Sequence, residues 1–309
     1  MSDYNIIMYI VEDDKNMSSP LFHDLKGLVQ KRNNIPINIL YHSYYFFGDY
    51  RISIRGDKIT FYKTPPVKRE YNLLKSDMTR FYNKYYVKGK KNILVYGGHE
   101  IHIYIDGMRN TNSTFFEHIE GLELLILDSC YSSTTSMLSH VMDKTNYVIA
   151  CQSASPYRGF ISCEFLKILN SRRCGKETKY KEIIKSFIKR NNLKHKALKK
   201  VNYRTDGVLL DMRRYKEMIE LLDSGELISE FKKISSARLE DVKNYNYYDL
   251  VTLLRHRCKN GCKESGGIIR KIKECVKYHK KNRLCKRFLS RNNKFLNGVS
   301  IWLKFGFKF

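Results

Sequence analysis

The sequence lacks features that mark several large classes of protein. Its 309 residues contain no apolar stretch long enough to cross a bilayer, and its first residues lack the basic segment of a signal peptide. Its eight cysteines lack the short regular spacing of a secreted disulfide scaffold, and no internal repeat is apparent. We therefore expect no membrane partner and a cytoplasmic or other intracellular location. The cytoplasm of a host cell, for a viral protein, is one such location.

Proline and tryptophan are also scarce, at 5 and 1 residues, whereas Lys, Asn, Ile and Tyr are abundant. This bias is typical of an AT-rich coding genome and weakens any argument from lysine counts. The net charge is nevertheless +26, from 57 basic and 31 acidic residues. Such an excess favours contact with nucleic acid, phospholipid headgroups or acidic proteins. The alternative is a lysine-rich solvated surface set by codon bias.

Buried strands and amphipathic helices alternate along the chain, and 42% hydrophobic residues suffice for a substantial core. Apolar runs predict strands at 4–11, 37–45, 92–97, 122–127, 147–151 and 207–210, while residues 49–63 alternate around Gly56-Asp57 as a hairpin does. Helical spacing predicts helices at 20–32, 68–86, 112–119, 134–142, 160–170, 180–190 and 213–222. This pattern predicts an α/β fold with a mostly parallel central sheet and helices on both faces.

A cysteine and a histidine follow two of the predicted strands. Cys130 follows the predicted strand 122–127 in the sequence Asp128-Ser129-Cys130, and His99 comes after Gly97-Gly98 at the end of an earlier strand. In open α/β sheets, ligands bind just outside the carboxyl ends of the strands. A thiol needs a partner to become a good nucleophile at neutral pH, so the two residues suggest a Cys-His dyad. The alternatives are a packed thiol and a hydrogen-bonded surface histidine.

The order strand–His, strand–Asp-x-Cys and a further strand resembles that of the caspase-like cysteine peptidases of clan CD. Within that clan the chain most resembles the clostripain family, C11. The most specific part is residues 122–160, and residues 6–17, 205–215, 237–254 and the tail GVSIWL agree as well. The resemblance implies a caspase-like core over 1–211. Beyond it we expect a basic, mainly helical region over 212–309 that returns to the core through a closing strand at 298–305.

The resemblance implies a cysteine endopeptidase that cleaves after Arg or Lys. Cys130 would be the nucleophile and His99 its partner, and the backbone N–H of Cys130 with those near Gly98 and Glu100 would bind the oxyanion. Asp128 and Ser153 would line the substrate pocket, where a carboxylate selects a basic side chain. A role for Asp128 in capping the next helix is the alternative. The partners implied are peptides or proteins with basic residues.

Several alternatives stay open at the predicted site. His102 is a lower-ranked partner for Cys130, and Cys151 is a competing thiol that we interpret as a small core residue. Arg109 is the one basic residue between His99 and Cys130 at which the chain could cut itself. No cofactor is required by the sequence, although calcium dependence occurs in the family and the acidic turn 12–14 supplies carboxylates.

A different class of function remains as the alternative to catalysis. Glu100 stands where the clan has glycine after the histidine, and the interval from His99 to Cys130 is short. The chain could therefore be a catalytically impaired homologue that binds nucleic acid or an acidic protein through its basic surface.

The C-terminal region also contains a set of potential zinc ligands with permitted but undiagnostic spacing. They are His256, Cys258, Cys262, Cys275, His279 and Cys285. We favour the alternative that residues 268–280 form one amphipathic helix with an incidental Cys and His, and we assign no metal ligand.

Overall fold

The computed structural model describes thirteen stretches of the chain. They are residues 2–11, 28, 33–43, 48–66, 71–98, 115–130, 132–152, 159–172, 174–192, 205–222, 247–259, 264–281 and 299–302. Within these ranges, no helix combines the length and the apolar character needed to cross a membrane.

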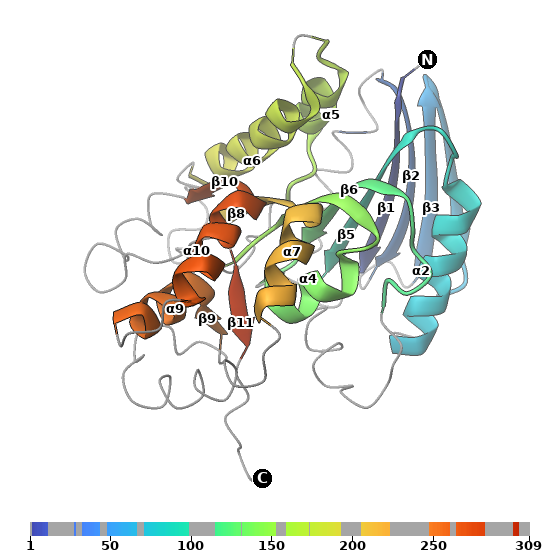
Figure 1. The fold of residues 1–309 in the computed structure, drawn as a ribbon. Helices are drawn as coiled ribbons and strands as arrows, with labels where there is room; N and C mark the ends of the chain where they lie inside the picture. The colour runs from blue at the N-terminus through green and yellow to red at the C-terminus, as the bar shows by residue number, and fades with distance from the viewer. Residues whose placement is uncertain are drawn as a thin grey trace.

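A nine-stranded sheet forms the centre of the molecule, in the order β10-β8-β7-β6-β5-β1-β2-β3-β4 (Figure 1). Its strands are β1 Tyr4–Val11, β2 Asn33–Ser43, β3 Gly48–Gly56, β4 Lys58–Thr64, β5 Lys91–Gly98, β6 Leu122–Asp128, β7 Thr145–Ala150, β8 Asp206–Asp211 and β10 Val276–Lys281. The short strands β9 (Tyr247–Asp249) and β11 (Ser300–Trp302) form a second, two-stranded sheet.

The large sheet is parallel only at its centre. Strands β7, β6, β5, β1 and β2 run parallel to one another. The outer pairings are antiparallel, β2 with β3 and β3 with β4 on one side and β7 with β8 and β8 with β10 on the other. The α/β fold is confirmed, but only the central strands of the sheet are parallel, whereas a mostly parallel sheet is predicted. The difference arises because the hairpin at Gly56-Asp57, which the sequence predicts, adds β3 and β4, and because the C-terminal region adds β10.

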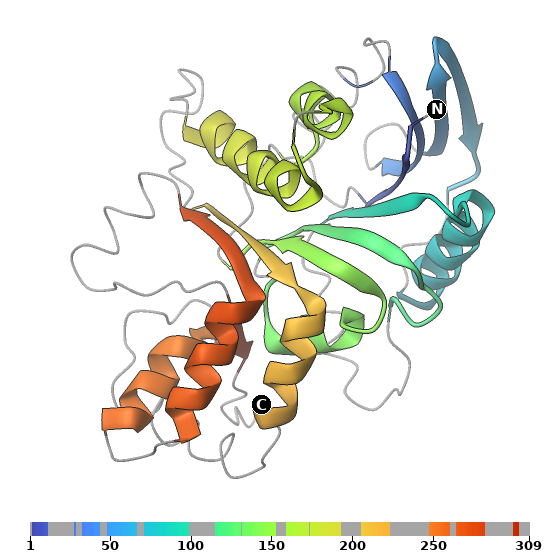
Figure 2. The same ribbon diagram turned by 45° about the horizontal axis from the view of Figure 1, so that its top comes forward.

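Apolar side chains on the two faces of the sheet form two separate cores. Along β1, Ile7 and Tyr9 belong to one core while Ile6 and Met8 belong to the other, as the alternation of a strand requires. The first core also contains side chains of the helices α2 (Tyr71–Tyr85), α4 (Thr135–Val141), α7 (Met212–Leu222), α9 (Leu250–Lys259) and α10 (Glu264–Cys275). The second contains those of α5 (Cys163–Asn170) and α6 (Lys176–Asn192). Figure 2 shows α5 and α6 above the sheet and the other helices below it.

Of the helices with described bounds, the first five match predicted helices within a few residues, whereas residues 115–118 of the predicted helix 112–119 form turns. In chain order the helices are α2, α4, α5, α6, α7, α9 and α10. Two of them start at side-chain caps, because Thr134 Oγ1 accepts a hydrogen bond from Met137 N at 3.3 Å and Ser162 Oγ accepts one from Phe165 N at 3.4 Å.

The C-terminal region is joined to the large sheet more closely than the sequence predicts, because it adds a strand to that sheet. Residues 268–280 do not form one helix, since α10 ends at Cys275 and β10 begins at Val276 as the edge strand beside β8. The closing strand β11 pairs with β9, not with the large sheet. The predicted boundary at 211/212 lies between β8 and α7.

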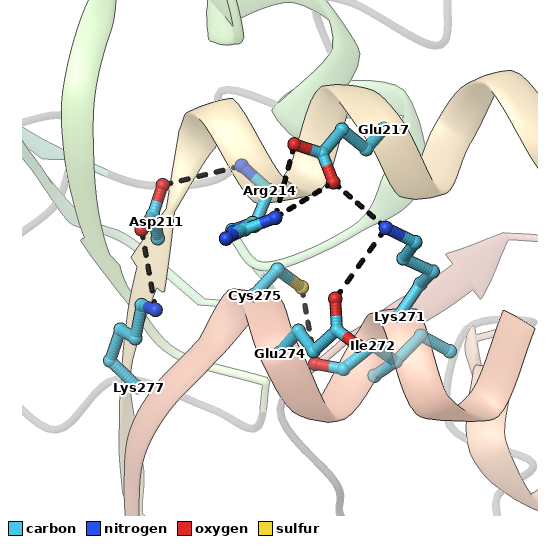
Figure 3. Close-up of polar contacts among 8 residues, drawn as sticks. All are labelled: Asp211, Arg214, Glu217, Lys271, Ile272, Glu274, Cys275 and Lys277. Carbon is cyan, nitrogen blue, oxygen red and sulfur yellow. Dashed lines mark hydrogen bonds and ion pairs between the residues drawn. The ribbon is translucent and has the colours of Figure 1, made fainter.

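Polar contacts join α10 and β10 to α7 and the end of β8 (Figure 3). Lys271 Nζ lies 2.8 Å from Glu217 Oε2, and Lys277 Nζ lies 3.4 Å from Asp211 Oδ2. These partly exposed pairs each contribute little to stability, because solvent screens them. The buried apolar side chains beneath them provide most of the attachment.

Candidate active site

The carboxyl ends of the central parallel strands form one edge of the sheet, called the carboxyl edge from here on. The register pairs Gly97 of β5 with Asp128 of β6, so the two strands end side by side. β6 and β7 are paired as well, with Ile126 opposite Ile149. The chain therefore brings the segments that follow β5, β6 and β7 to the same edge, where ligands bind in such sheets.

Cys130 lies at this edge, two residues beyond the last residue of β6, and is a half-buried cysteine that forms no disulfide. Cys151, the competing thiol, is 0% exposed and belongs to the core on the α5–α6 face. The interpretation of Cys151 as a core residue is confirmed. Of the two thiols that follow β6 and β7, Cys130 is the one within reach of a ligand.

Two buried serines hold the turn that contains Cys130. Ser132 Oγ donates a hydrogen bond to Leu127 O at 3.1 Å and accepts one from Cys151 N at 3.1 Å. Ser133 N donates to Cys151 O at 3.0 Å. The turn after β6 is thereby fixed to the ends of both β6 and β7. Sequence reasoning missed these roles, although two small polar residues after a buried strand are a recognisable signal.

The helix α4 begins too far along the chain from Cys130 for its dipole to act directly on the thiol. α4 starts at Thr135 with Thr134 as its N-cap, and the intervening Ser132 and Ser133 are not helical. The field of a helix acts mainly within its first turn. The field of α4 therefore contributes little to stabilising a thiolate at Cys130.

Asp128 is nearly buried, at 9% exposure, and binds the chain ahead of α5. Its Oδ2 accepts a hydrogen bond from Phe160 N at 2.9 Å. A Cβ on Gly159 would lie 1.7 Å from the same oxygen, so only glycine fits there. The guanidinium of Arg190 in α6 donates to Gly159 O from the other side. Because the N-cap of α4 is Thr134, the alternative role of Asp128 as the cap of that helix is wrong.

The end of β5 is similarly restricted in space. A Cβ on Gly98 would lie 3.1 Å from Val11 O and 3.2 Å from Tyr96 Oη, a spacing that glycine alone fits without a shift. The residues that follow are outside the described part of the chain. That applies to His99, Glu100, His102, Arg109 and Ser153, and to the acidic turn 12–14, so their placement stays a prediction.

A buried histidine lies between two carboxylates at the same edge. His42 pairs with Val11 and Val11 with Gly98, which places the three at one level of the sheet. The His42 side chain is 0% exposed, with Nδ1 2.9 Å from Asp49 Oδ1 and Nε2 3.4 Å from Asp77 Oδ2. Burial lowers the pKa of this imidazole, but the two carboxylates outweigh burial, so the pKa of His42 is raised.

Two of the potential zinc ligands have other partners. The Cys275 thiol is buried in the core, where burial raises its pKa to about 12, and it donates to Ile272 O at 3.2 Å. His279 Nε2 lies 2.7 Å from Asp206 Oδ2. Cys262, Cys285 and the side chain of His256 lie outside the described residues. Within the described part of the chain, no three potential ligands gather into a metal site.

No family model matches the sequence, and no curated protein matches it either. Solved structures do match. An inactive zymogen C11 protease from Parabacteroides distasonis aligns with a TM-score of 0.67 at 13% identity, over 98% of this chain and 92% of that one. The chain has the fold of the C11 cysteine proteases.

Two further C11 structures from Bacteroides thetaiotaomicron agree. A secreted C11 cysteine protease called iotapain aligns with a TM-score of 0.66 at 13% identity, over 97% of this chain and 93% of that one. A secreted C11 cysteine protease in complex with an irreversible peptide inhibitor aligns with a TM-score of 0.67 at 12% identity, over 98% and 93%. The caspase-like fold that the sequence resemblance implies is confirmed over nearly the whole chain.

Proposed function

We propose that the protein is a cysteine endopeptidase that uses Cys130 as its nucleophile and His99 as the partner base and acid. One observation carries the proposal: in a C11 protease fold, the half-buried thiol of Cys130 lies just beyond β6 at the carboxyl edge. The neighbouring strand β5 ends at Gly98, directly before His99 in the sequence. A peptide inhibitor bound to a C11 cysteine protease of the same fold supports a peptide as the ligand.

In this mechanism the Cys130 thiolate attacks the carbonyl carbon of the scissile peptide bond, after His99 has taken the thiol proton. The oxyanion that forms accepts hydrogen bonds from the N–H of Cys130 and from an N–H between Gly98 and Glu100. His99 then returns its proton to the departing amine, which leaves an acyl-thioester on Cys130. Water hydrolyses the thioester and restores the thiol. The charge of Glu100 does not remove the N–H on which the oxyanion depends.

Asp128 and Ser153 line the pocket for the residue before the cut bond, and Asp128 gives that pocket a preference for Arg or Lys. The Asp128 carboxylate is positioned by its bond to Phe160 N. A carboxylate has about four acceptor positions, so it can hold a backbone N–H and a substrate cation together. Guanidinium binding by a nearly buried carboxylate is strong because it is charge-assisted. Proteins with exposed basic residues are the expected substrates.

The test is turnover of a fluorogenic peptide that ends in Arg, beside the same peptide ending in Asp. We expect the wild type to cleave the Arg peptide alone and Cys130→Ala to cleave neither. Cys163→Ala is the matched control, because Cys163 is also a half-buried thiol but lies in α5. Unchanged turnover in Cys130→Ala would contradict the proposal, and the assay run with Ca²⁺ and with a chelator decides whether calcium is needed.

The alternative of a non-catalytic basic protein gains no support from the described residues or from the structural neighbours. A salt-sensitive complex with DNA or RNA, together with no Cys130-dependent turnover, is the result that would favour it.

A further inference from the structure

Three segments from distant parts of the sequence meet at one residue of the carboxyl edge, Gln152. This residue follows β7 and Cys151, is 3% exposed and directly precedes Ser153 in the sequence. Its partners lie at the start of β8, at the end of β9 and just before β11. In the sequence these are the blocks 205–215, 237–254 and 298–303, which agree with the C11 pattern but have no role in the proposed chemistry.

The backbone of Gln152 binds the large sheet. Gln152 N donates to the Asp206 carboxylate, at 3.1 Å from Oδ1 and 3.3 Å from Oδ2. Asp206 is 0% exposed, and its Oδ2 lies 2.7 Å from Nε2 of His279 in β10. One buried carboxylate therefore holds the end of β7 and the edge strand β10 together.

The side chain of Gln152 binds the small sheet. Its Nε2 donates to Asp249 Oδ2 at 2.9 Å and to Val299 O at 3.0 Å. Asp249 is 2% exposed and caps α9, since Thr252 N and Thr252 Oγ1 both donate to Asp249 Oδ1 at 2.8 Å. The same Val299 O accepts from Leu250 N at 3.1 Å. The amide nitrogen of Gln152 thus donates to both segments, the end of β9 and the residue before β11.

We infer that Gln152 is a positioning residue for the substrate-binding segment that begins at Ser153, and that the C-terminal region acts on substrate binding through it. The inference rests on the proposed peptidase function. Bonds from both the backbone and the side chain fix where the chain leaves β7 and how it is rotated there. Ser153 follows Gln152 directly in the sequence, so these bonds set the point from which the proposed substrate-binding segment starts. Displacements of about 1 Å at such positions cost up to about 100-fold in rate.

The variant Gln152→Glu removes the side-chain donor and places a carboxylate against Asp249 and the Val299 carbonyl. We expect KM for the Arg peptide to rise about tenfold or more while kcat changes less, because the substrate segment moves and the nucleophile does not. Alkylation of Cys130 by iodoacetamide should change much less than KM, since Ser132 Oγ also ties the turn of Cys130 to Leu127 in β6.

Two further variants separate positioning from a general loss of structure. Adding Asp249→Asn to Gln152→Glu restores a donor and an acceptor at this contact, so part of the KM effect should be reversed. Lys271→Ala is the control, because it loosens the C-terminal region at α7–α10 without touching Gln152, and it should leave KM unchanged (Figure 3). If Gln152→Glu does not fold, Gln152→Met removes the same donor with nearly the same volume and without a charge.

The inference is overturned if a folded Gln152 variant binds and cleaves the Arg peptide as the wild type does. It is also overturned if KM and Cys130 alkylation change together, or if Lys271→Ala raises KM as much. A wild type that shows no Cys130-dependent turnover contradicts the proposed function itself, and with it this inference. Normal wild-type turnover with unaffected Gln152 variants contradicts only the inference.

Discussion

Replacing Gly159 by alanine should disturb the proposed pocket through a single added methyl group. The new Cβ would lie 1.7 Å from Asp128 Oδ2 and 2.7 Å from Cγ, whereas non-bonded heavy atoms pack at about 3.5–4.0 Å. The Asp128 carboxylate or the chain at Gly159 must therefore move by more than about 1 Å. Either movement breaks the 2.9 Å bond from Phe160 N to Asp128.

The cost has two parts. Losing a hydrogen bond to a charged group costs about 1.5–3 kcal/mol, and the strain of an overpacked site adds about 1–3 kcal/mol. We expect Gly159→Ala to lower the free energy of unfolding by about 3–5 kcal/mol in urea titrations. For the Arg peptide, kcat/KM should fall by up to about 100-fold, because the carboxylate that selects Arg is displaced.

A double-mutant cycle with Asp128→Ala tests the reasoning, since removing the carboxylate removes the clash. In that background the added methyl group should cost much less, which gives a coupling energy of about 1–3 kcal/mol. Gly175→Ala is the control, because nothing lies within 4 Å of a Cβ there. Additive costs of Gly159→Ala and Asp128→Ala would refute the steric account.

Three other predictions follow from the same edge of the sheet. The raised pKa of His42 means that its ion pairs with Asp49 and Asp77 stabilise the fold below pH 6.5, the ordinary pKa, and lose this effect as pH rises through the raised pKa. Urea midpoints measured between about pH 6 and about pH 9 should therefore fall more in the wild type than in His42→Leu. At pH 6 the variant itself should lose up to about 3–5 kcal/mol, because buried Asp49 and Asp77 lose the imidazolium, while Asp77 keeps its longer contacts with Arg51 and Arg80. Equal pH dependence in both proteins would contradict this. Ser132→Ala should lose about 1–3 kcal/mol and slow Cys130 alkylation, as followed by mass spectrometry, because the turn after β6 loses two hydrogen bonds. Gly98→Ala should lower kcat more than it raises KM, because contact of the new Cβ with Val11 O and Tyr96 shifts the end of β5, directly before His99 in the sequence. An effect on KM alone in steady-state kinetics would show that this strand end does not position the base.

Much of the fold could be predicted because each central strand is a continuous apolar run. Residues 4–11 and 122–127 match β1 and β6 closely, and the hairpin signal at Gly56-Asp57 gives β3 and β4. The transition from α10 to β10 could not be read from helical spacing. Residues after Cys275 are half-buried along their whole length, and their strand exists because they pair with β8, a contact of residues far apart in the sequence.

The candidate site could also be predicted only in part. Cys130 and Asp128 could be found because they follow a buried strand, and the sequence resemblance identified their fold. The partners that hold the site, Phe160 for Asp128 and Asp206 for Gln152, come from segments 32 and 54 residues away. No local pattern marks such a contact. Glycine is required at position 159 for a reason of the same kind, because the Asp128 carboxylate lies where a Cβ would be.

The central claim is that Cys130 attacks a peptide carbonyl next to a basic side chain. The most direct measurement is labelling with a peptide chloromethyl ketone that ends in Arg, followed by peptide mapping in the mass spectrometer. The account predicts one adduct per molecule, on Cys130, formed faster than with the matching Asp reagent and absent in Cys130→Ala. Labelling spread over the exposed thiol Cys174 and the half-buried Cys163, with no preference for Arg, would contradict it.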